Sequence, residues 1–102
     1  MSRGPDADTL LERALVAHAA RGGVVVAIVE ANWERWASAT FAGARHALTL
    51  EAAAGDALDA WLAALPEADL SFRRTLVADL TVVAVRRGDP VHVSLEVLTV
   101  EE

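Results

Sequence analysis

Two runs of β-branched residues near the carboxyl end limit the folds available to this chain more than any other feature. Residues 75–85 and 91–100 are rich in valine, leucine and threonine, and the segment 86–90 between them contains glycine, aspartate and proline. This pattern is typical of two antiparallel strands joined by a tight turn. Because an isolated hairpin is only marginally stable in water, the rest of the chain must cover it. The sequence therefore predicts a sheet protein built around this hairpin.

Two segments before the hairpin have the spacing of amphipathic helices. Apolar residues recur at helical intervals over residues 7–21, where Asp6 or Asp8 can cap the first turn. A second helix is expected to begin at Asp56 and to end before Pro66, because proline cannot continue a helix. We expect both helices to bury their apolar stripes against the sheet.

Two more strands are expected between these helices. Residues 24–29 form a continuous apolar run, and residues 44–51 alternate between apolar and polar positions. The polar segment 32–36 is interpreted as a connection. Residues 38–43 fit either the start of a strand or a turn of helix. Alternation places His46 on the same face as Leu48 and Leu50, so we expect it to be half-buried and hydrogen-bonded.

The order of elements is therefore αββαββ, in a single domain over residues 1–102. We expect an α+β two-layer sandwich, in which two helices cover one face of a four-stranded antiparallel sheet. A circular permutation of the ferredoxin-like plan gives the same order, which is a topological analogy and implies no function. The order also repeats itself, which suggests an internal duplication of about 7–52 and 55–101.

Composition narrows the classes of partner. The net charge of −6 argues against nucleic acid, which attracts positively charged surfaces. The absence of cysteine excludes disulfides, thiolate ligands and a cysteine nucleophile. No apolar run approaches the roughly 18 residues of a membrane span, and the first residues lack the apolar segment of a signal peptide. We therefore expect a cytoplasmic protein that binds neither nucleic acid nor membrane.

Several strands are apolar on both faces, as residues 24–29 and 82–85 illustrate. Two helices cover only one face of such a sheet, and soluble monomers rarely expose large apolar patches. We therefore expect a homodimer that forms through the helix-free face. Alternate residues of the last strand share one face, and this face is the candidate interface: His92, Ser94, Glu96, Leu98 and Val100.

A second hypothesis concerns the aromatic residues. Trp33 and Trp36 lie in what the sequence indicates is a connection, where binding residues are common. Together with Phe41 and His46 they are candidates for the walls of a pocket for a small apolar ligand. The alternative is that the two tryptophans fold back as a lid over the end of the sheet.

A third hypothesis is a cofactor-free enzyme in which His46 or His92 acts with an acid as a general base. A Ser94–His92 pair is too distant for nucleophilic catalysis, since residues i and i+2 of a strand stand about 7 Å apart. The three histidines lack metal-binding spacing, so we expect no metal and no cofactor. No motif selects among an assembly module, a ligand-binding protein and an enzyme, although the two-faced strands favour the first.

Overall fold

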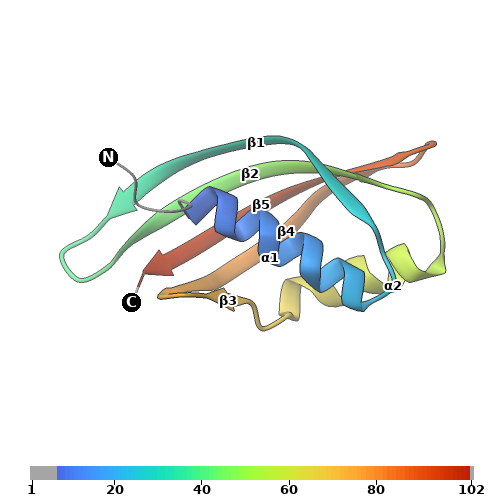
Figure 1. The fold of residues 1–102 in the computed structure, drawn as a ribbon. Helices are drawn as coiled ribbons and strands as arrows, with labels where there is room; N and C mark the ends of the chain where they lie inside the picture. Colours follow the sequence, from blue (N-terminus) through green and yellow to red (C-terminus); the bar gives the residue numbers. More distant parts are fainter. Residues whose placement is uncertain (1–6, 102) are drawn as a thin grey trace.

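The computed structural model describes residues 7–101, without the side chain of Ala7, and confirms a mixed α/β fold (Figure 1). Asp6 and the residues before it lie outside this range. Both helices begin where the sequence predicts, and the carboxyl-terminal hairpin is present. The elements are α1 (Ala7–Arg21), β1 (Val26–Ala37), β2 (Ala42–Ala52), α2 (Asp56–Ala64), the short 3₁₀ helix η1 (Leu65–Glu67), β3 (Ser71–Phe72), β4 (Thr75–Arg86) and β5 (Val91–Glu101).

The expected four-stranded, two-layer sandwich is wrong, and with it the ferredoxin-like arrangement. The sheet has five antiparallel strands in the order β1-β2-β5-β4-β3, and it curls into a half-barrel (Figure 1). The helices lie within this curl instead of forming a layer on a flat face. Helix α1 contacts both β1 and β3, the two ends of the strand order, so it crosses the open side of the half-barrel.

Irregularities in the long outer strands account for much of the curl. The register of β1 shifts between Ile28 and Glu30, and that of β4 shifts between Val82 and Ala84. Val29 and Val83 are therefore extra residues, and they lie on either side of the level of the Thr49–Ser94 pair. Because a β-bulge bends its strand and increases the local twist, two bulges at neighbouring levels help to fold the sheet around the helices.

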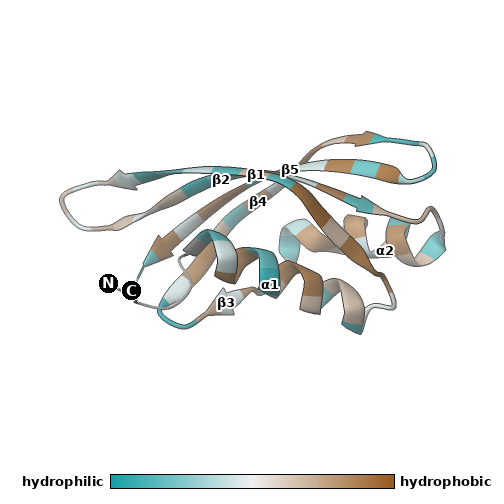
Figure 2. Ribbon diagram, turned by 45° about the horizontal axis from the view of Figure 1, so that its top comes forward, coloured by the Kyte–Doolittle hydropathy of each residue, from teal (hydrophilic) through white to brown (hydrophobic). Residues whose placement is uncertain are grey.

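Two strand predictions also need correction. The segment 32–36 is not a connection, because β1 continues through it to Ala37 and pairs with β2 along that length. Figure 2 shows how β1 changes from apolar at its beginning to polar further along, which is why only its first half reads as a strand in the sequence. Residues 38–41 form the turn, in which the Ser38 side chain accepts hydrogen bonds from the main chain of Thr40 and Phe41. No sequence pattern indicates β3, which has only two residues.

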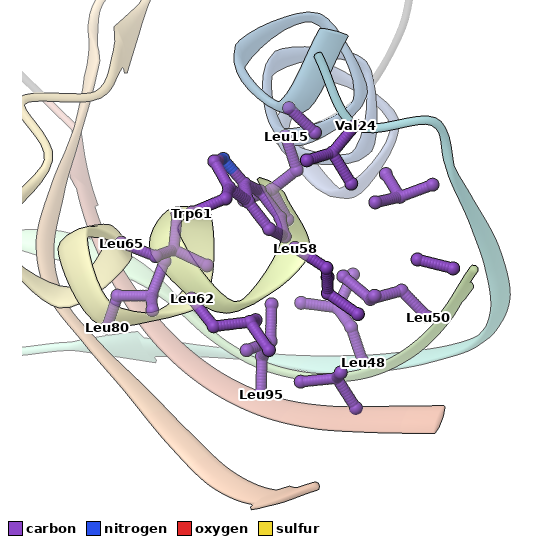
Figure 3. Packing of buried hydrophobic residues seen from close by; sticks show 14 of the residues in the cluster. Leu15, Val24, Leu48, Leu50, Leu58, Trp61, Leu62, Leu65, Leu80 and Leu95 are labelled. Atoms are coloured by element: carbon purple, nitrogen blue, oxygen red, sulfur yellow. The ribbon is translucent and has the colours of Figure 1, made fainter. Parts of the chain in front are cut away.

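The hydrophobic core fills the inside of the half-barrel. Helix α1 contributes Leu11 and Leu15, which are fully buried, and α2 contributes Leu58 and Trp61. Figure 3 shows these helices and the strands meeting in one cluster, in which Trp61 lies between α1 and the side chains of the sheet. Burial of such side chains is the main source of stability for a domain of this size. No helix within residues 7–101 is long and apolar enough to cross a membrane.

Candidate functional site

Strict alternation along the strands gives the sheet two distinct faces. We call the face toward the helices the inner face and the opposite face the outer face. Residues directly opposite each other in antiparallel strands share a face. Cross-strand pairing then assigns each position: for example, Trp33, His46, Val97 and Leu80 form one inner row, and Glu34, Arg45, Leu98 and Asp79 form an outer row.

The outer face contains a shallow hollow of about 620 Å³. Trp33, His46 and Val97 border it, but alternation directs their side chains to the inner face. Small or apolar side chains, Ala47 and Leu98, lie in the middle strands. The polar side chains of the hollow are exposed and come from four strands: Asn32, Glu34, Arg45, Asp79, Thr81 and Glu96.

These polar side chains combine one positive charge with three negative charges. Arg45 lies directly opposite Glu34 across β1 and β2, yet among residues 7–101 it forms no ion pair within 4.0 Å. The charged groups of the hollow are therefore exposed to solvent and available to a ligand. Their arrangement suits a small polar molecule that carries charges of both signs.

An apolar strip borders the hollow at one end of the outer face. Trp36, Leu76 and Val100 lie in one cross-strand row, and Leu98 lies in the next. Gly43 completes the first row, where an added Cβ would overlap the Thr99 carbonyl oxygen and lie 3.1 Å from Trp36 Nε1. Trp36 therefore packs across a position that only glycine can occupy. Its indole Nε1 is buried and has no hydrogen-bond partner among residues 7–101.

His46 lies on the inner face, as alternation predicts, but it is fully buried instead of half-buried. Its Nε2 is 3.0 Å from the Thr99 hydroxyl, which donates in turn to the Ala44 carbonyl oxygen at 3.3 Å. Because that hydroxyl proton is used, Nε2 must donate to Thr99. On its other side, His46 Nδ1 lies 3.5 Å from Oδ1 of Asp8, in the first turn of α1.

This series of a carboxylate, an imidazole and a hydroxyl has the order of groups in a nucleophilic triad. Its geometry does not support that chemistry, because the Thr99 side chain is only 1 % exposed and its proton is already donated. The series instead links the first turn of α1 to β2 and β5 through buried polar contacts. We assign it a structural role.

His92 and Glu51 form a second histidine–acid pair, on the outer face. They are direct cross-strand neighbours, and His92 Nε2 lies 3.1 Å from Glu51 Oε2. Both side chains are partly exposed. Ser94 and Glu96 share the face of His92 but occupy successive rows of the sheet, so the three residues do not converge as a catalytic group. The five residues predicted as an interface do share the outer face of β5.

Only two of the four residues predicted to line an apolar pocket, Trp33 and His46, come together. Trp33 pairs with His46 on the inner face, whereas Trp36 pairs with Gly43 on the outer face. Phe41 lies at the end of the turn and is 56 % exposed. The reason is that a strand, and not a loop, carries the two tryptophans, and residues three apart in a strand point to opposite faces.

Sequence reasoning missed two residues of the buried polar series and the one positive charge of the hollow. The sequence pattern indicates Asp8 only as a helix cap, and it does not mark Thr99 or Arg45 as functional candidates. No local signal links His46 to Thr99, which is 53 residues away. Residues 7–101 contain no group of three histidine, cysteine, aspartate or glutamate side chains that could hold a metal ion. Comparison with protein-family models, curated proteins and solved structures finds no match.

Proposed function

We propose that this protein is an assembly module that functions as a homodimer. The observation that carries the proposal is the exposure of apolar side chains on the uncovered parts of the sheet. Leu76, Val83 and Val85 are 41 %, 52 % and 36 % exposed, and all three lie in β4. Exposed apolar side chains that cluster on a strand are typical of surfaces that bind another protein.

Because the chain is negatively charged overall, a second copy is a suitable partner only if opposite charges meet within the contact. Two chains that each carry a net charge of −6 repel each other at long range. A stable contact must therefore bring opposite charges together at the interface itself. The outer-face residues of β5, from His92 to Val100, remain one predicted surface for this contact. A cytoplasmic location remains part of the proposal.

Sedimentation equilibrium over a range of concentrations tests the proposal. We expect a reversible association, with the mass rising from the 10.8 kDa of one chain toward twice that value as the concentration increases. A mass of 10.8 kDa at every concentration up to the millimolar range would contradict it.

A second candidate function, binding of a small molecule, is favoured by the hollow on the outer face. The ligand would be polar and carry both charges, because Arg45 lies among Glu34, Asp79 and Glu96. A free α-amino acid such as arginine is a suitable probe in a chemical-shift titration. Saturable shifts confined to these residues in the wild type, and lost in Arg45→Ala, would support the candidate. Shifts that do not saturate would exclude this class of ligand.

A further inference from the structure

Strand β4 leaves most of its outer edge without a partner strand. Strand β3 pairs only with Thr75 and Leu76, and Leu70 accepts one further hydrogen bond from the main-chain amide of Val77. From Asp79 to Arg86, no strand among residues 7–101 pairs with this edge. An open strand edge is a template for pairing with another chain, and proteins usually cover or charge it.

The side chains along this edge form a simple pattern. The six residues from Leu80 to Val85 are uncharged, and the two flanking positions carry opposite charges, Asp79 and Arg86. Both flanking side chains are exposed, and neither forms an ion pair within residues 7–101. The edge therefore presents an apolar centre between two unpaired and opposite charges.

We propose that a second copy of this chain pairs antiparallel with this edge, so that the two β4 strands join two sheets into one. The proposal rests on the assembly function proposed above and assigns its interface. The observation that selects a second copy is charge complementarity: an antiparallel, two-fold symmetric contact sets the beginning of one β4 against the end of the other. Asp79 of each copy then faces Arg86 of the other.

The β-bulge at Val83 makes this register geometrically consistent. Val82 pairs with Leu95 and Ala84 with Ser94, so Val83 is an extra residue in β4. If the bulged residue Val83 is left out of the count, Asp79 lies three positions before Val82 and Arg86 lies three positions after it. A two-fold axis at Val82 therefore sets Asp79 against Arg86, Leu80 against Val85, and Thr81 against Ala84.

In each of these pairs, both residues also lie on the same face of the sheet. Asp79, Thr81, Ala84 and Arg86 pair with outer-face residues of β5, and Leu80, Val82 and Val85 pair with inner-face residues. Directly opposite residues must share a face, and a slip by one position would break this match along the whole edge. The charges thus select this register, and the bulge and the alternation of faces are consistent with it.

The other free edge does not offer the same complementarity. Strand β1 carries Glu30 and Glu34 on the outer face and Arg35 on the inner face. In an antiparallel pair of β1 strands, Arg35 could not stand opposite either acid, because opposite residues share a face. This edge has a bulged valine as well, so Val29 is a matched control for Val83.

Charge reversal and charge exchange test the register directly by sedimentation equilibrium. Asp79→Arg or Arg86→Asp alone sets like charges against each other twice in each dimer, so each should raise the dimer Kd at least about tenfold. The double variant exchanges both charges and should restore the Kd to within about threefold of the wild type. Both positions are exposed, so circular dichroism should show an unchanged fold.

Two further variants separate failure of this interface from failure of the assembly function. Val83→Arg should dissociate the dimer, whereas Val29→Arg should leave it intact. A wild-type dimer that survives Val83→Arg and both single charge reversals, but dissociates in Leu98→Arg, would overturn the β4 interface and leave the assembly function standing. A wild type that is monomeric throughout would overturn the assembly function itself.

Discussion

The Thr99 hydroxyl both accepts and donates a hydrogen bond in the interior of the protein. It accepts from Nε2 of His46 and donates to the Ala44 carbonyl oxygen, and its side chain is almost completely buried. His46 in turn lies beside Asp8, so a single hydroxyl links β5 to β2 and, through the imidazole, to α1. A buried imidazole of this kind requires a partner for its N–H group.

Replacing Thr99 with valine keeps the shape of the side chain and removes this partner. We expect Thr99→Val to lower the free energy of unfolding by about 1–3 kcal/mol, because a buried donor is left without an acceptor. Thr49→Val is a matched control: Thr49 is a half-buried β2 residue on the outer face. Urea denaturation measures both. Equal and small effects of the two substitutions would contradict the assigned role of Thr99.

At the residue scale, the sequence predicts faces better than partners. Alternation with Leu48 and Leu50 correctly places His46 on the inner face. It underestimates the burial of His46, because α1 covers this part of the sheet and the sequence does not position that helix. The contact with Thr99 depends on the pairing of β2 with β5, and the composition of neither strand specifies this register.

Among the elements, α2 has the clearest packing anchor. Trp61 is 5 % exposed, which confirms that α2 buries it, and its Nε1 donates a hydrogen bond of 2.9 Å to His18 Nδ1 of α1. The indole therefore joins the two helices as well as filling the core (Figure 3). His18 is half-buried at this helix–helix contact.

We expect Trp61→Ala to lower the free energy of unfolding by roughly 3–5 kcal/mol, the usual range for loss of a buried aromatic side chain. Val16→Ala, at an exposed position of α1, should change it by no more than about 0.5 kcal/mol. Chemical denaturation measures the difference. A loss below about 1 kcal/mol for Trp61→Ala would mean that α2 does not depend on this side chain.

The elements that the sequence predicts well are those determined by local chemistry. Helix α1 and the start of α2 follow from apolar spacing and from Pro66, and the hairpin follows from two β-rich runs around a turn. The second half of β1 is polar and lies at an edge, so its strand conformation depends on pairing with β2. Strand β3 has two residues, too few for any pattern, and exists because β4 is beside it.

At the scale of the whole molecule, the half-barrel depends on features without a sequence signature. The bulges at Val29 and Val83 lie in continuous apolar runs, where one additional valine looks like any other. Their combined effect is to help curl the sheet around the helices, and the shortness of β3 leaves residues 79–86 of β4 without a partner strand among residues 7–101. The polar outer face and the free edge of β4 follow from the strand register, which no local sequence pattern specifies.

Hydrogen–deuterium exchange at the free edges is the most direct test of assembly through β4. At concentrations above the dimer Kd, we expect those amides of residues 79–86 that point away from β5 to exchange slowly, because pairing with a second copy satisfies them. Dilution below the Kd should accelerate this segment, whereas residues 30–36 of β1 should exchange at an unchanged rate. Exchange of residues 79–86 that is independent of protein concentration, while the mass still shows association, would contradict the account.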